Sequence, residues 1–189
     1  MKKSSLLIAV FAIAISGFLT SCNKDDDPQP ALEYKTEGAI NGKITGVTKD
    51  NSYTFNDDFN FTQYSLLIPT SYATYEVNTD GSYEVNLTRV DFANNGQAVI
   101  SFDLSSAADT TPDDPEFYIN YYKELDNKII NFYMDSDNGA NTLAITEFTF
   151  DATTGKVKGK YTMSGASNST EKNATVAGAF ELTARKVTQ

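Results

Sequence analysis

The sequence predicts an all-β domain built from antiparallel strands. Apolar and polar residues alternate in several segments, for example at Tyr83, Val85 and Leu87 with polar residues between them, and this period of two is typical of a strand with one buried face. Clusters of Asn, Asp and Gly separate these segments, as turns do, and no segment after residue 21 has a clean apolar period of 3.6 residues. We therefore expect roughly eight to ten short strands that form either an antiparallel β-sandwich or a lipocalin-like barrel.

The first 21 residues predict a secretory signal peptide. Lys2 and Lys3 precede an apolar run over residues 6–15, which Ser16 and Gly17 interrupt. A basic head, a short apolar stretch and small residues before a cleavage point are typical of such signals. A membrane-spanning helix is the alternative, but it needs about 18 apolar residues without interruption. Secretion of a soluble form cut near residue 21 is a second alternative, and it would leave one unpaired thiol.

That thiol belongs to Cys22, the only cysteine of the chain. Residues 19–22 read Leu-Thr-Ser-Cys and resemble the lipobox of bacterial lipoproteins. The resemblance implies that Cys22 becomes the first mature residue and carries acyl chains such as palmitate. One acyl chain binds a membrane only marginally, whereas two or more bind it firmly. We therefore expect the membrane to be a partner through a lipid anchor at Cys22.

Residues 22–32 predict a flexible acidic tether. After Cys22 the sequence reads Asn-Lys-Asp-Asp-Asp-Pro-Gln-Pro, which contains no apolar residue to bury and two prolines. The stretch resembles the surface-export signal of lipoproteins from the Bacteroidetes, which implies an outer-membrane protein that faces the cell exterior. An aspartate close to an acylated cysteine is also similar to an inner-membrane retention signal of other bacteria, and this is the alternative.

Residues 33–189 predict a single all-β domain. Residues 72–77 and 83–88 form a predicted hairpin, because Asn-Thr-Asp-Gly lies between them. A turn at 94–96 leads into residues 98–102, and alternation returns at 157–163 and at 176–184. In residues 143–150 the apolar positions change from one face to the other, which predicts either a β-bulge or a strand that is covered on both faces.

Short glycine-based segments carry a second resemblance. Residues 39–43 (Ala-Ile-Asn-Gly-Lys) resemble the opening strand of small uncharacterised lipoproteins of the Bacteroidetes. Residues 148–159 and 176–181, which contain a Gly-Ala-Phe strand, are similar to their closing hairpin. The resemblance implies a β-sandwich or lipocalin-like barrel on a lipid anchor, and it implies no activity.

The composition excludes several kinds of chemistry. The chain contains no histidine and no tryptophan, and its formal net charge is −10. Nucleophiles that depend on an imidazole base and zinc sites built on His and Cys are therefore excluded. An acidic surface repels phosphate backbones, so we expect no nucleic-acid partner. No motif calls for a cofactor.

Two segments contain candidate site residues. The aromatic run at 117–122 places tyrosines on both faces of a predicted strand, and Tyr118, Tyr121 and Tyr122 are candidates for contact with a ligand or a partner. Oxygen-bearing side chains at Asp135, Asp137 and Asn141 are candidate calcium ligands, but a turn rich in Asp, Asn and Gly has the same composition.

Paired carboxylates for glycosidase chemistry are the remaining catalytic possibility. The adjacent pairs at 57–58 and 113–114 are expected in polar loops, where they share solvent rather than form a tuned acid and base. We therefore expect no enzyme. The sequence favours a non-catalytic envelope protein whose sheet or loops contact a glycan or an envelope protein. The alternative is a lipocalin-like carrier of a small apolar ligand.

Overall fold

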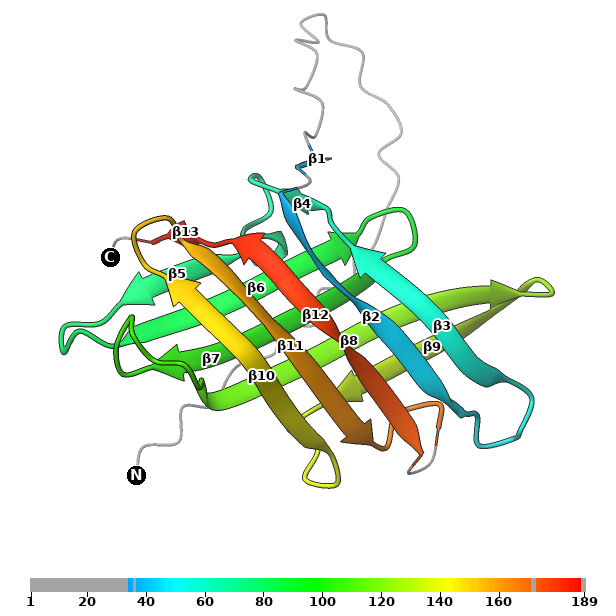
Figure 1. Ribbon diagram of the computed structural model, residues 1–189. Helices are drawn as coiled ribbons and strands as arrows, with labels where there is room; N and C mark the ends of the chain where they lie inside the picture. The colour runs from blue at the N-terminus through cyan, green and yellow to red at the C-terminus, as the bar shows by residue number, and fades with distance from the viewer. Residues whose placement is uncertain (1–33, 36, 171–172, 188–189) are drawn as a thin grey trace, which may run out of the picture. The chain divides into compact units, whose positions relative to one another are not determined.

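The domain consists of two packed β-sheets. The computed structural model describes residues 34–35, 37–170 and 173–187, and these belong to one compact unit, Leu32–Gln189. The predicted signal peptide, Cys22 and the tether lie outside the described residues. One sheet has the strand order β10 (Thr142–Asp151), β11 (Lys156–Gly165), β12 (Ala174–Thr183), β2 (Gly38–Val47) and β3 (Thr54–Phe61). The other has the order β13 (Arg185–Lys186), β5 (Thr74–Val77), β6 (Tyr83–Asp91), β7 (Gly96–Leu104), β8 (Asp113–Leu125) and β9 (Lys128–Asp135) (Figure 1).

The remaining elements are small. Strands β1 (Tyr34–Lys35) and β4 (Tyr64–Ser65) form a two-stranded ladder, and a 3-10 turn, η1, spans Pro69–Ser71. Within the described ranges, no helix has the length and apolar character needed to cross a membrane. The prediction of an all-β, antiparallel fold is confirmed. Among the described strands, β13 and β5 are the one pair that runs parallel.

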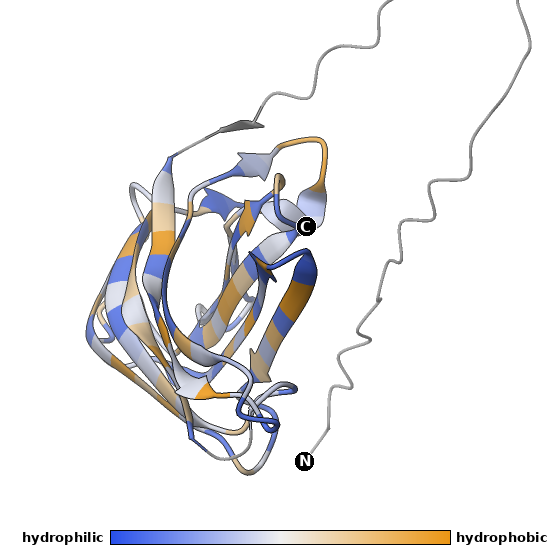
Figure 2. Ribbon diagram, turned by 90° about the vertical axis from the view of Figure 1, so that its right-hand side faces the viewer, coloured by the Kyte–Doolittle hydropathy of each residue, from blue (hydrophilic) through white to orange (hydrophobic). Residues whose placement is uncertain are grey.

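The two sheets form a sandwich and do not close into a barrel. The five-stranded sheet ends at β10 and β3, and the six-stranded sheet ends at β13 and β9. Seen along the layers, the two sheets lie face to face (Figure 2). The lipocalin-like barrel, one of the two predicted architectures, is therefore wrong. Alternation alone could not decide this, because each strand has one buried face in both architectures.

Buried side chains from both sheets fill the space between them. In β3 every second residue is buried, and the buried positions include Phe55, Phe59 and Phe61. Aromatic rings meet across the interface: the centroids of Phe55 and Phe132 lie 5.1 Å apart. Burying an aromatic side chain of this size contributes about 1.5–3 kcal/mol. The two inner faces therefore hold the sheets together.

Glycines make room for the largest rings of this core. Gly42 and Gly178 are cross-strand partners on the inner face of β2 and β12. The Tyr161 hydroxyl lies 2.8 Å from where a Cβ of Gly42 would stand, and it donates a 3.0 Å hydrogen bond to the Asn41 carbonyl. A side chain at Gly178 would stand 1.9 Å from the same carbonyl oxygen. The paired glycines thus leave room for the close approach of β2 to β12 and of the Tyr161 hydroxyl to β2.

Local turn and bulge signals in the sequence correspond to the observed turns. The predicted hairpin is β5 and β6, closed by hydrogen bonds from Asn78 N to Ser82 O and from Gly81 N to Asn78 O. The face change in residues 143–150 is a β-bulge between Thr146 and Thr149, where Glu147 has a φ of +51°. As a result, Leu143 and Phe150 both face the core.

A buried cation links the two sheets near the start of β2. Arg89 of β6 has 1% of its surface exposed, and its guanidinium donates to the carbonyl oxygens of Glu37, Gly38 and Thr88. It also lies 4.8 Å from the centre of the Tyr64 ring, which is cation–π distance. Burial lowers the pKa of Arg89 to about 10.

Candidate functional site

Strand β8 presents its tyrosines on two opposite faces. Phe117 and Ile119 are buried in the core, so Tyr121 points inward and Tyr118 and Tyr122 point outward. The three candidate residues therefore lie on two faces of β8, although Tyr121 and Tyr122 both line one cavity near the end of the strand. Tyr118 and Tyr122 belong to an open face of the six-stranded sheet, and Tyr121 borders a cavity between the sheets.

The open face carries tyrosines and amides on neighbouring strands. Pairing between β8 and β9 sets Tyr118 beside Asp135, Asn120 beside Tyr133, and Tyr122 beside Asn131. We call these six residues the tyrosine face. The Tyr118 and Tyr133 rings lie with their centroids 6.3 Å apart and their planes tilted by 37°. Tyr133 is 37% exposed, so the ring of this residue is accessible to a ligand.

Hydrogen bonds link the amides of the tyrosine face in series. Asn168, from the loop between β11 and β12, donates to Asn131 Oδ1 (2.5 Å), and Asn131 donates to Asn120 Oδ1 (2.7 Å). Asn120 in turn donates to the Tyr122 hydroxyl (3.0 Å). Each amide nitrogen carries two N–H donors and uses one of them in this series. The second N–H of Asn120, the second N–H of Asn131 and the hydroxyl proton of Tyr122 have no acceptor among the described residues. These three donors therefore remain for a bound molecule.

The charged side chains on the strands of the tyrosine face are acidic, and a cation lies at its edge, where Lys49 Nζ donates to the Asn168 carbonyl at 3.1 Å. Asp135 accepts a 2.6 Å hydrogen bond from the Tyr133 hydroxyl, and burial together with this bond raises the pKa of Tyr133. Burial and the charges of Asp137 and Asp135 raise the pKa of Glu116, on the same face of β8. None of the outward residues of β7, β8 and β9 is basic. The face therefore suits a neutral, hydroxyl-rich ligand better than an anionic one.

The candidate calcium ligands order a turn between β9 and β10. The Asp135 carboxylate accepts from the Asp137 backbone N–H at 3.0 Å. The Asn141 amide donates to the Asp135 and Ala166 carbonyls and accepts from the Ala166 N–H. In the part of the chain that the structure describes, no three His, Cys, Asp or Glu side chains are grouped so that they could hold a metal ion.

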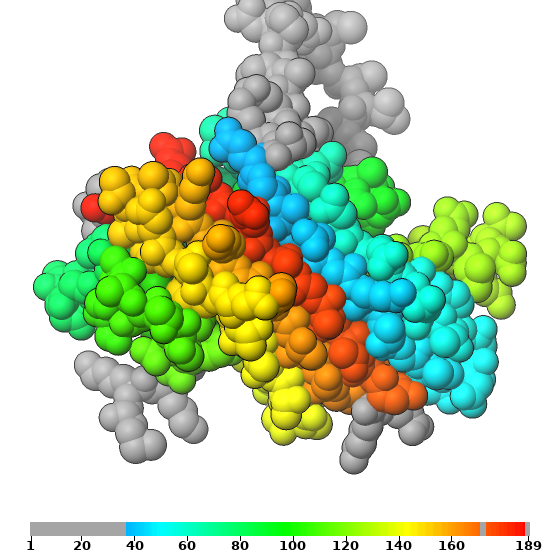
Figure 3. Space-filling view, viewed as in Figure 1, coloured from blue at the N-terminus to red at the C-terminus, as the bar shows by residue number. Residues whose placement is uncertain are grey.

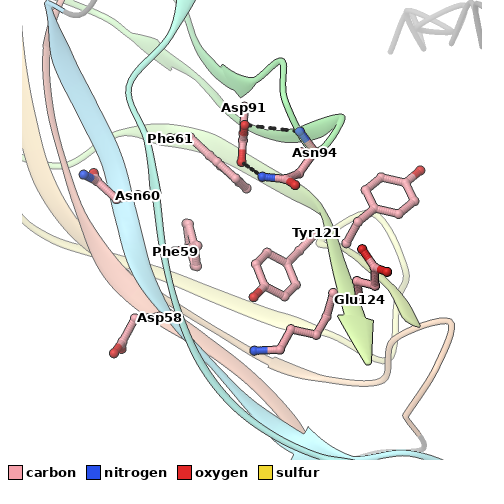
Figure 4. A pocket seen from close by; sticks show the side chains of 11 residues that line it. Asp58, Phe59, Asn60, Phe61, Asp91, Asn94, Tyr121 and Glu124 are labelled. Carbon is pink, nitrogen blue, oxygen red and sulfur yellow. Dashed lines mark hydrogen bonds between the residues drawn. The ribbon is translucent and has the colours of Figure 1, made fainter. Parts of the chain in front are cut away.

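Tyr121 lies at a cavity of about 330 Å³ between β3 and β8, which we call the edge cavity. Phe59 and Phe61 of β3 and Tyr121 point into it, and Asp91 and Asn94 close one end, joined by hydrogen bonds (Figure 4). The full lining comprises Asp58, Phe59, Asn60, Phe61, Asp91, Asn94, Gly96, Tyr121, Tyr122, Lys123 and Glu124.

A buried carboxylate lies beside the edge cavity. Asp57 is 9% exposed, and its two oxygens accept hydrogen bonds from Lys123 Nζ (2.6 Å) and from the Tyr53 hydroxyl (2.7 Å). The bond to Asp57 raises the pKa of Lys123. Burial and then the charge of Asp57 raise the pKa of Tyr121. The placement of Asp57 and Asp58 in a polar loop was wrong, because both lie in β3 and point to opposite faces.

The other expected loop pair, Asp113 and Asp114, begins β8 instead.

Tyr133 and Asn131 were not among the candidate residues predicted from the sequence. Asn120 lies at every second position with Tyr118 and Tyr122, so the alternation of the sequence could have placed it on the same face of the strand. No local signal identifies Asn168, because it reaches the tyrosine face from a different hairpin.

The outer face of the five-stranded sheet is of a different kind. Figure 3 shows this face from β10 to β3. A hollow of about 580 Å³ at its β10–β12 end has Asp151, Lys156, Lys158 and Glu181 in its lining. Both signs of charge alternate there, and no aromatic side chain of the outward face contributes. It resembles a solvated sheet surface more than a binding site.

Comparisons with known proteins add no relative. A scan against protein-family models, a search of curated proteins and a search of solved structures each found no match to this chain.

Proposed function

We propose that this chain is a non-catalytic, lipid-anchored protein of the bacterial outer membrane whose tyrosine face binds a neutral glycan outside the cell. The observation that carries the binding part is the series of linked amides and hydroxyls at Asn131, Asn120 and Tyr122, flanked by the rings of Tyr118 and Tyr133. Sugars combine apolar C–H faces with hydroxyls that both donate and accept. Tyrosine rings and amides complement these two properties.

The acidic surroundings define the class of glycan. Glu116 and Asp135 lie on the same face, and no outward residue of β7–β9 is basic. A sulfated or sialylated chain meets like charges there and gains no ion pair. Neutral hexoses and their oligosaccharides avoid this cost.

The anchor part of the proposal rests on the sequence around Cys22. An acylated protein remains at the membrane only while its acyl chains are buried, and a polar tether then displays the domain outside. The carrier role has less support, because the sheets do not close into a barrel around an apolar interior and the edge cavity has charged side chains in its lining. The alternative partner is an envelope protein. The glycan experiment separates the two, because a protein partner gives no signal on glycans.

A glycan array tests the binding part. The full chain, solubilised in detergent, is applied to arrays of neutral and acidic glycans. We expect signal on neutral chains only. Tyr133→Ala or Asn131→Ala should weaken it by about three- to tenfold, which is the size of an aromatic contact for Tyr133 and of a hydrogen bond for Asn131. Tyr72→Ala, a half-buried tyrosine away from the face, is the matched control. A flat array, or equal binding by all variants, contradicts the proposal and directs the search to a protein partner.

Metabolic labelling tests the anchor part. In a bacterial host, the natural chain should incorporate labelled palmitate, partition with outer membranes, and be cut by protease added to intact cells. Cys22→Ala should lose the label and leave the membrane fraction. Retention of Cys22→Ala in membranes with an uncut N-terminus would show that the anchor is not acylation.

A further inference from the structure

Among the described residues, three of the four outer edges of the two large sheets are protected. The β10 edge contains the bulge at Thr146–Thr149. The β9 edge is covered by Asn168, whose N–H donates to the Tyr133 carbonyl and whose Oδ1 accepts from the Tyr133 N–H. The β13 edge is only two residues long. Bulges, coverage and short strands are the usual protections against pairing with another chain.

The fourth edge, β3, is open. Its eight residues, Thr54–Phe61, pair with β2 on one side, and among the described residues no strand pairs with the other side. An open edge leaves alternate backbone N–H and C=O groups available to an added strand. The inward charge of Asp57 on this strand is already neutralised by Lys123.

A second free edge borders the same cavity. Asn120 of β8 pairs with Gln97 at the beginning of β7, so the residues of β8 after Asn120 continue beyond β7 and pair only with β9. Figures 1 and 3 show this hairpin projecting past β3. The edge cavity is lined by residues 58–61 of β3 and 121–124 of β8. Consecutive residues from both strands therefore form its two walls.

The charge of the edge cavity indicates the chemistry of its occupant. Asp58, Asp91 and Glu124 line it. The only cation of the lining, Lys123, is held at 2.6 Å by Asp57. The rings of Phe59, Phe61 and Tyr121 point into the same cavity, so an aliphatic stem that ends in a cation fits both the rings and the carboxylates.

We propose that the open edge of β3 accepts an extended, basic segment of a partner protein as an added strand. One of its inward side chains, a lysine or an arginine, occupies the edge cavity. The added backbone pairs with β3, and the alternating side chains outside the cavity meet solvent and Asp58. This surface meets the tyrosine face at Tyr122, which lines the edge cavity as well, but pairing along β3 does not depend on the proposed glycan binding.

The test uses a fluorescein-labelled peptide of alternating lysine and valine, titrated into the full chain in detergent and followed by fluorescence anisotropy. Two matched peptides are compared: one with glutamate in place of lysine, and one methylated at alternate backbone nitrogens. We expect the basic peptide to bind about tenfold more tightly than either, because strand addition requires both main-chain donors and the complementary charge. Hydrogen exchange of the β3 amides should slow on binding, whereas that of the β10 amides should not change.

Variants of the protein complete the test. Asp58→Asn combined with Glu124→Gln should weaken binding by about threefold or more, since Asp58 lies beside the added strand on the outer face of β3 and Glu124 lines the edge cavity. Glu84→Gln, an exposed carboxylate on another strand, and Asn131→Ala on the tyrosine face should leave it unchanged. Equal affinity for the N-methylated peptide, or equal affinity for lysine amide alone, overturns strand addition. Equal binding by the Asp58 and Glu124 variant overturns the placement at β3.

Discussion

Lys123 Nζ lies 2.6 Å from Asp57 Oδ1 and joins β8 of the six-stranded sheet to β3 of the five-stranded sheet. The residues are 66 positions apart in the chain. Asp57 is nearly buried, and its second oxygen is held by the Tyr53 hydroxyl. This contact closes the side of the sandwich next to the edge cavity.

Removing the ammonium from this contact should destabilise the domain. In Lys123→Met the Asp57 carboxylate keeps only Tyr53 as a partner, and a buried acceptor that loses a partner costs about 1–3 kcal/mol. Chemical denaturation, with the midpoint and slope compared with those of the natural chain, measures the loss. Lys128→Met is the matched control, because Lys128 is exposed at the tip of the same hairpin. A loss of equal size in both variants would show that the pair contributes nothing specific.

The glycine pair below Tyr161 should tolerate no side chain. A Cβ at Gly178 stands 1.9 Å from the Asn41 carbonyl oxygen and 2.5 Å from the Gly42 Cα, both backbone atoms. We expect Gly178→Ala to lower the free energy of unfolding by at least about 2–3 kcal/mol. Gly139→Ala, where nothing lies within 4 Å of the added Cβ, should change it by about 0.5 kcal/mol or less. Thermal unfolding of both variants checks this, and similar melting temperatures would contradict the packing argument.

The guanidinium of Arg89 should not be replaceable by an ammonium. Its fork donates to three carbonyl oxygens, those of Glu37, Gly38 and Thr88, and a lysine cannot reproduce that planar geometry. Arg89→Lys leaves buried carbonyls unpaired, and we expect a loss of about 2–3 kcal/mol in the free energy of unfolding. Urea denaturation measures it. A variant as stable as the natural chain would show that the three bonds are not needed.

Two carboxylates next to the tyrosine face, Glu116 and Asp103, should make the stability of the domain depend on pH. Burial, and then neighbouring carboxylates, raise the pKa values of Glu116 and Asp103 in the folded state. The folded state therefore holds these protons more tightly than the unfolded chain does. The stability that this contributes is fully present below the unfolded pKa of about 4 and is lost as pH rises through the raised folded pKa.

Glu116→Gln, which stays neutral, should be more stable than the natural chain at pH 7. The difference should disappear near pH 3 and shrink with added salt, which screens like charges on the surface. Melting temperatures at the two pH values, with and without salt, measure this effect. Glu181→Gln, on the opposite sheet, serves as the control. A difference in stability between Glu116→Gln and the natural chain that does not change with pH would show that folding does not disfavour the charged form of Glu116.

Local pattern predicted much of the fold. Alternation at Tyr83, Val85 and Leu87 identified β6 and its buried face, and the turn before it closes the predicted hairpin. The apolar face change near Glu147 indicated a bulge as one alternative, and the bulge is present. These features depend on residues two to six positions apart, whose relation the backbone period sets directly.

The grouping of candidate residues was less predictable. Alternation separates Tyr121 from Tyr118 and Tyr122, but only pairing with β9 brings Tyr133 beside Asn120. Asp57 was expected in solvent because it is charged and followed by another aspartate. Asp57 can be buried because Lys123 pairs with it, and no residue close to Asp57 in the sequence predicts this partner.

The sequence by itself determined the all-β class, the hairpins and the inward or outward direction of most strand residues, because these follow from a local period of two and from turn chemistry. Only the tertiary structure decided that the sheets stack as an open sandwich, that Asp57 meets Lys123, and that β3 remains unpaired beside a cavity. Those outcomes depend on which distant strands pack together. The free energy that favours one packing over another comes from many contacts across the whole core, so no short segment of sequence reveals it.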